Sequence, residues 1–225
     1  MTVNNASDNT GKTMKQRVSR FFLIGFAVVG IACTLTIPFV YESQTLWYKV
    51  GVDKTFLRAG QLLGLLALIS LIVQIFFGSR GKVLEETFGV AALMAWHRAN
   101  GILLCCLVSL HIALVLVPEG IANLPIGVKH WPEMVGGVLF LVIFSQVISS
   151  FFRQQLGFIY KQWRMVHRAL GYLALCLAAV HVLFVADSFA QGVPRIALLV
   201  MLVTVFALIA VIKASILIRK IKDRR

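Results

Sequence analysis

Six long runs of apolar residues follow one another along the chain, and the short segments between them hold most of the proline, glycine and charge. A helix needs about 20 apolar residues to cross a bilayer core about 30 Å thick. Runs of that length cover residues 20–41, 57–77, 90–117, 133–152, 165–186 and 194–217. The pattern predicts an all-α membrane protein, with one six-transmembrane-helix bundle over 20–217 between a polar N-terminal tail at 1–19 and a basic tail at 218–225.

The first run follows four basic residues, an arrangement that signal peptides share with membrane anchors. No obvious small-x-small cleavage site precedes Tyr41, and Gly30 stands where a lipobox before Cys33 would carry an aliphatic residue. We therefore expect a retained helix rather than a cleaved signal or a lipoprotein anchor. The polar residues before Lys12 are expected to be disordered.

Composition supports the membrane assignment and gives an orientation. The chain of 225 residues is 59% hydrophobic and 14% charged, whereas soluble domains average about 45–50% apolar and about 25% charged residues. Its net charge is +13, yet the basic residues lie between apolar runs rather than in a patch for nucleic acid. With the N-terminus inside, 17 of the 22 Lys and Arg residues fall on the cytoplasmic side, so both termini are expected there.

All four cysteines lie inside apolar runs: Cys33, Cys105, Cys106 and Cys176. Disulfides are not expected in that setting, and no CxxC pair indicates zinc. We interpret the cysteines as small packing residues.

Four of the five histidines also lie inside predicted spans, where ionisable residues are functional candidates. His97 and His111 stand in the third span, and His167 and His181 in the fifth. The interval of fourteen positions is the same in both pairs, and the sequence around them repeats. WHRANGILLCCLVSLH at 96–111 recurs as VHRALGYLALCLAAVH at 166–181.

Fourteen residues bring a helix back to within about 40° of the same face, about 21 Å further along its axis. The third and fifth spans run parallel, so His97 is expected at the depth of His167, and His111 at the depth of His181. Two facing imidazoles at each of two depths are what two bis-His haems require. One pair is expected toward the cytoplasm and the other toward the outer side.

Small and basic residues accompany these histidines. Gly101 and Gly171 share the histidine faces and would make room for a porphyrin, although small residues also serve plain helix packing. Arg98 and Arg168 could pair with haem propionates or could only reflect the positive-inside rule. Other positions are read as structural: Gly60 and Gly64 as a helix-packing seam, and Trp96, Trp163 and Tyr172 as interface or packing aromatics.

Two other readings stay open. The histidines could be hydrogen-bonding bundle residues, or the relay of a polytopic proton-coupled transporter. A site with two metal ions is disfavoured because no Asp or Glu lies in the middle of a span and histidines about 21 Å apart cannot share an ion.

The two His-Arg motifs, each followed by a second histidine at the same interval, resemble the ferric reductase-like transmembrane domain. RAGQLLGLLALISLIVQIFFGSR, followed by LEETFG and WHRANG, is similar to bacterial predicted ferric reductases, and the resemblance covers residues 55–190. It implies an oxidoreductase of the bacterial inner membrane with two haems b between the third and fifth helices, moving electrons outward. It also implies iron ligation by His97 with His167 at the inner haem and by His111 with His181 at the outer haem.

Many members of that family continue into a cytoplasmic domain that binds FAD and NADPH. No dinucleotide-binding glycine-rich strand–helix unit is found here, so this chain is not expected to bind FAD or NAD(P)H. We expect the donor to be a separate cytoplasmic flavoprotein or a quinol, and an acceptor to dock at the outer face.

Overall fold

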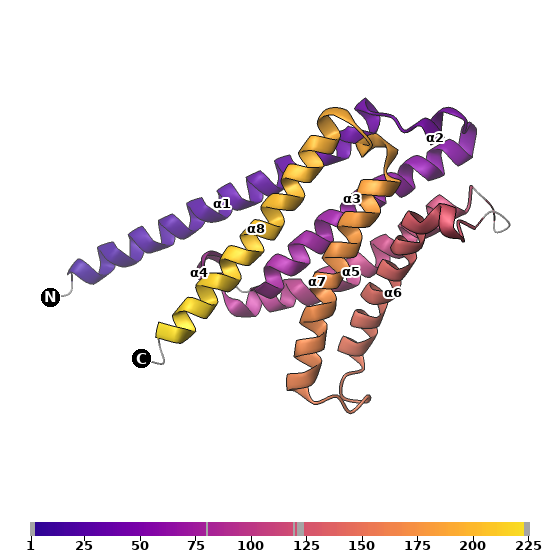
Figure 1. The fold of residues 1–225 in the computed structure, drawn as a ribbon. Helices are drawn as coiled ribbons and strands as arrows, with labels where there is room; N and C mark the ends of the chain where they lie inside the picture. The colour runs from indigo at the N-terminus through magenta and orange to yellow at the C-terminus, as the bar shows by residue number, and fades with distance from the viewer. Residues whose placement is uncertain (1–2, 80, 119, 121–123, 223–225) are drawn as a thin grey trace.

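The computed structural model describes residues 3–79, 81–118, 120 and 124–222. Figure 1 shows a bundle of long helices, and the described residues contain no strand. The long helices are α1 (Val3–Val40), α3 (Gly51–Ser79), α5 (Val90–Leu116), α6 (Trp131–Phe151), α7 (Tyr160–Val185) and α8 (Gly192–Lys222). The short ones are α2 (Gln44–Trp47), α4 (Lys82–Phe88), and the 3-10 turns η2 (Val128–His130) and η3 (Asp187–Phe189).

Six helices among the described residues are long and apolar enough to cross a membrane, which confirms the predicted all-α bundle. Their ends differ from the apolar runs. The described part of the expected N-terminal tail is helical from Val3 rather than disordered, and α3 and α7 begin earlier, at Gly51 and Tyr160. Backbone hydrogen bonds propagate a helix without apolar side chains, so hydropathy marks where lipid contact starts and not where the helix starts.

The helix α3 is the central element of the bundle. It packs most extensively on α5 and also contacts α1, α7 and α8, while α7 packs mainly on α6. Two helical hairpins result (Figure 1), a first hairpin of α3, α4 and α5 and a second hairpin of α6 and α7. Their shared core is a layer of aliphatic side chains that includes Leu65, Leu68, Leu71, Leu104, Val108, Ile143, Ala174 and Ala178.

Large apolar side chains cover the outside of the bundle. Phe21, Phe26 and Leu141 are each more than half exposed, as expected for helices that face lipid acyl chains instead of water. Cys33, Cys106 and Cys176 are exposed as well, and all four cysteines are free thiols. The interpretation of these three cysteines as packing residues was therefore wrong. Hydropathy places a residue in a span but does not show which face of the helix turns inward.

Candidate functional site

The structure brings the four intramembrane histidines together as two facing pairs. The rings of His97 on α5 and His167 on α7 have centroids 6.1 Å apart, and those of His111 and His181 are 6.5 Å apart. We call the His97–His167 pair the inner level and the His111–His181 pair the outer level. The repeated interval between the histidines predicts this pairing, and the role of the imidazoles as ligands stays a prediction.

Both separations fit a metal ion held between the two rings of a pair. A metal–imidazole nitrogen bond is about 2 Å long, so two rings on opposite sides of one ion have centroids about 6 Å apart. Among the described residues no three His, Cys, Asp or Glu side chains form a cluster that could hold a metal ion. Each level thus offers two protein ligands, which is the donor set of a metal whose other ligands come from a macrocycle.

Three of the four imidazoles are oriented by main-chain carbonyl groups of the neighbouring helix. The Nδ1 atoms of His111 and His181 lie 2.7 Å and 2.9 Å from the carbonyl oxygens of Gly60 and Pro132. The Nδ1 atom of His97 lies 3.2 Å from the carbonyl oxygen of residue 74. A carbonyl can only accept, so each of these three Nδ1 atoms carries the hydrogen and each Nε2 has a lone pair, which is the tautomer that can bind a metal through Nε2.

Glycines provide the space in which these rings lie. A Cβ atom at Gly64 would be 2.9 Å from the ring of His111, and one at Gly136 would be 2.5 Å from the ring of His181. A Cβ at Gly78 would be 3.4 Å from His97. At Gly64 and Gly136 the backbone and the imidazole approach so closely that no side chain fits between them, whereas the distance at Gly78 is an ordinary van der Waals contact.

The packing-seam interpretation is therefore only partly right. A Cβ at Gly60 would meet Val115 of α5 at 2.9 Å, which is helix packing, but Gly64 makes room for a histidine. The proposed seam was read from small residues four apart on one helix. That spacing does not reveal which side chain of the partner helix lies against them.

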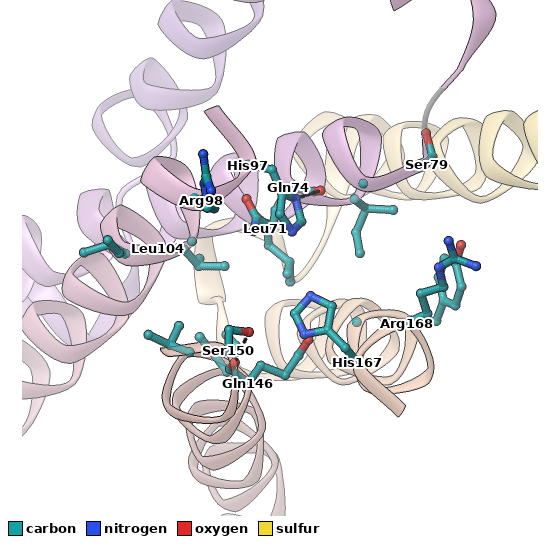
Figure 2. Close-up of a pocket in the computed structure, with 18 of the residues that line it drawn as sticks. Leu71, Gln74, Ser79, His97, Arg98, Leu104, Gln146, Ser150, His167 and Arg168 are labelled. Atoms are coloured by element: carbon teal, nitrogen blue, oxygen red, sulfur yellow. Dashed lines mark hydrogen bonds between the residues drawn. The ribbon is translucent and has the colours of Figure 1, made fainter. Parts of the chain in front are cut away.

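A cavity of about 430 Å³ surrounds the inner level (Figure 2). Gly101 and Gly171 line it, as the histidine faces predict, together with apolar residues such as Ile75 and Ile143. Ligand sites typically enclose about 300–1,000 Å³ and are mostly apolar with a few placed polar groups. The inner level thus combines paired imidazoles with space for a prosthetic group.

The described residues that line this cavity include three cations and no carboxylate. Arg98 and Arg168 are the two predicted from sequence, and Lys213 of α8 is the third. The Lys213 ammonium lies 5.6 Å from the centre of the Tyr172 ring, which also lines the cavity. The cavity therefore favours a ligand with negatively charged groups at this end of the bundle, which we call the basic end. Lys213 lies in a helix without a motif, so the sequence indicates it only as one of the 17 basic residues expected on the cytoplasmic side.

Trp163 was also missed as a site residue. Its ring stacks on His167 with centroids 5.0 Å apart and an interplanar angle of 26°. The two residues are four apart on α7, so they share a helix face. That spacing could have indicated a role beside the histidine, but position near the end of a span favoured an interface aromatic.

A polar network in the apolar surroundings of α3 and α5 leads to His97. The Asn100 amide nitrogen donates to Gln74 Oε1 at 2.8 Å and to the Ser70 carbonyl at 2.9 Å, and Ser70 Oγ donates to Asn100 Oδ1 at 2.9 Å. Gln74 Nε2 lies 3.3 Å from His97 Nε2. The network connects the two helices of the first hairpin at the inner level.

The second hairpin repeats the first in both of its helices. The repeat of the histidine motif on α7 was expected, but α6 also repeats α3. Gly64 and Gln74 of α3 recur as Gly136 and Gln146 of α6, with the same interval between glycine and glutamine. Gly136 lies against His181 as Gly64 lies against His111, so the two equivalent glycines each make room for a histidine ring at the outer level.

Comparison with known families agrees with this arrangement. Residues 63–169 match the family model described as ferric reductase like transmembrane component. The matched segment contains His97, His111 and His167 and ends before His181. No curated protein and no solved structure matches the chain significantly. Residues 63–169 are therefore similar to a ferric reductase-like transmembrane component, within a multi-pass membrane protein.

Proposed function

We propose that this chain is a haem b-containing membrane oxidoreductase that moves electrons across the bilayer. The observation that carries the proposal is the pair of histidine levels, whose ring separations of 6.1 Å and 6.5 Å would suit an iron held between the two imidazoles. The match to the ferric reductase-like family model also supports a role as a membrane oxidoreductase. In this proposal His97 and His167 would hold the inner haem, and His111 and His181 would hold the outer haem.

A haem bound at each level supplies one-electron redox chemistry. The protein residues would bind and orient it: the Nε2 atoms would be the ligands, while main-chain carbonyls hold three of the four imidazoles by their Nδ1–H groups. Arg98, Arg168 and Lys213 would pair with carboxylates at the basic end. Between the levels, buried side chains such as Leu104 and Ala174 exclude water.

The direction of transfer follows from the proposed topology, with both termini and the basic end in the cytoplasm of a bacterial cell. A separate flavoprotein or a quinol would donate electrons to the inner level. The acceptor would approach the outer level, near the connection 118–132. A ferric chelate is the acceptor that the family description suggests, and this acceptor would make the chain a ferric reductase.

Absorption spectroscopy and haem quantitation of the purified protein test the proposal. We expect a Soret band, a reduced α-band typical of bis-His b-type haem, and two haems for each chain. The rival transporter reading predicts solute flux by a protein that contains no haem. Colourless protein purified from haem-replete cells would refute the electron-transfer function.

A further inference from the structure

The repeat of the two hairpins shows which group should orient each imidazole. At the outer level, His111 donates to the carbonyl of Gly60, and His181 donates to the carbonyl of Pro132, which is the position equivalent to Gly60 in the second hairpin. At the inner level, His97 donates to the main-chain carbonyl of residue 74. The repeat therefore points to residue 146 as the partner of the fourth histidine.

His167 does not make the equivalent bond. Its Nδ1 atom is buried and has no hydrogen-bond partner in the part of the chain that the structure describes. An N–H group that leaves water without finding an acceptor is costly, so such groups are almost always paired. His167 thus needs an acceptor that the main chain does not provide.

Two neighbouring differences between the hairpins bear on the missing bond: Ser149 and Ser150 stand where the first hairpin has Phe77 and Gly78. Gly78, which faces the His97 ring with no side chain between them, is replaced at the equivalent position by Ser150. The Ser150 hydroxyl donates to the carbonyl of Gln146 at 2.6 Å, and the Ser149 hydroxyl donates to the same oxygen at 3.1 Å. The carbonyl that would accept from His167 is therefore already used, and a side chain stands where the first hairpin has none.

The Gln146 side chain offers the missing acceptor. It lines the inner cavity together with His167, and Figure 2 shows it extending from α6 toward the His167 ring. Its Oε1 atom is 4.0 Å from the position of a Cβ on Gly171, so it reaches the face of α7 one turn from His167. A Cβ at Gly171 would therefore lie in contact with the Gln146 carboxamide, between it and the backbone of α7.

We propose that the Gln146 carboxamide is the positioning group of His167, with Oε1 accepting the hydrogen of Nδ1 while Nε2 binds the inner haem. The inference rests on the proposed haem function. According to this proposal the two inner histidines differ in their hydrogen-bond acceptor. His97 is oriented by a main-chain carbonyl, whereas His167 is oriented by a side chain that a substitution can change. A stronger acceptor at Nδ1 raises imidazole basicity and favours ferric iron, so residue 146 adjusts the inner potential.

Redox titration of purified holoprotein tests this role with two opposite substitutions. Gln146→Leu removes the acceptor and should raise the inner midpoint potential, whereas Gln146→Glu provides a stronger acceptor and should lower it. The outer potential should not move. The inner haem is identified as the one that a His97→Ala variant loses, and its low-spin EPR signal should change with each substitution at 146.

Ser145→Ala is the matched control, since the Ser145 hydroxyl bonds within α6, to the carbonyl of Val142. It should leave both potentials and both EPR signals unchanged. Unchanged inner potentials in both Gln146 variants, or shifts in one direction that a packing change would cause, would overturn the assignment. Wild-type protein without haem would instead reject the function on which the inference rests.

Discussion

The two helical hairpins share one plan and differ mainly at the inner level. At the outer level each hairpin places its histidine against a glycine, Gly64 or Gly136, and orients it with a main-chain carbonyl. At the inner level, Gly78 of the first hairpin becomes Ser150 in the second. The outer level is therefore nearly symmetric, whereas the inner level has unlike halves.

The hairpins also differ in polar content. Ser70 and Asn100 form a network in the first hairpin, and the equivalent residues of the second are Val142 and Leu170. The repeat keeps the histidines and the glycines beside the outer histidines, whereas the residues around them differ between the hairpins. Conserved and variable positions of the repeat therefore have different roles. The shared residues fix where the imidazoles lie, and the residues that differ can adjust one ligand without moving the others.

The largest effect is expected when a ligand is removed from either hairpin. Each haem would be shared by the hairpins, so His111→Ala and His181→Ala should have the same result, loss of the outer haem with the inner one kept. The haem-to-protein ratio should fall to half in both variants. If either protein retains both haems, the ligand assignment is incorrect.

A methyl group on the glycines beside the outer histidines should act next most strongly. The new Cβ would be 2.5 Å from His181 in Gly136→Ala and 2.9 Å from His111 in Gly64→Ala, so the ring must move. Overpacking of this kind costs about 1–3 kcal/mol, and we expect lower outer-haem occupancy, with Gly136→Ala the more severe. Optical titration of haem content measures it.

The neighbouring Gly137 is the control, because a Cβ there would have nothing within 4 Å. Gly137→Ala should keep full haem content. Equal losses in Gly136→Ala and Gly137→Ala would mean that helix packing in general, and not the histidine contact, explains the effect.

Making the first hairpin resemble the second should have a moderate effect on stability. Asn100→Leu introduces the residue found at the equivalent position 170 and removes the bonds of Asn100 to Ser70 and Gln74. Hydrogen bonds between membrane helices average about 0.6 kcal/mol with a maximum near 1.7 kcal/mol. The free energy of unfolding in detergent should fall within about that range.

Ser109→Ala serves for comparison because the Ser109 hydroxyl bonds to the Cys105 carbonyl of its own helix. Its unfolding free energy should match the wild type. An Asn100→Leu protein as stable as the control would show that the network does not stabilise the first hairpin.

The smallest effect is expected from making the second hairpin resemble the first. Ser150→Gly removes the shorter of the two hydroxyl bonds to the Gln146 carbonyl, at 2.6 Å, and leaves the 3.1 Å bond from Ser149, so His167 can share that carbonyl. Alone it should shift the inner potential little. Combined with Gln146→Leu it should reduce the potential shift of that substitution, because a main-chain acceptor now remains. If the shift of the inner midpoint potential in the double variant equals the sum of the two single shifts, His167 does not exchange the Gln146 side chain for the main-chain carbonyl.

Much of the fold and the histidine register could be predicted without a structure. Apolar runs of bilayer length indicated the six spans, and the repeated interval between His97 and His111 and between His167 and His181 indicated two facing pairs. The repeat of α3 in α6 could also have been found. Gly64 recurs as Gly136 in the later segment, but without the structure nothing connected either glycine to a histidine.

The sequence by itself determined which segments enter the membrane and which imidazoles share a depth, because hydropathy and helical periodicity are local and need no knowledge of neighbours. Only the tertiary structure decided what surrounds each ring. Lys213 reaches the cavity from a helix without a motif, and three carbonyls reach Nδ1 atoms from helices elsewhere in the sequence. Main-chain carbonyls are the same in every residue, so only the packing of one helix on another selects those that meet an imidazole.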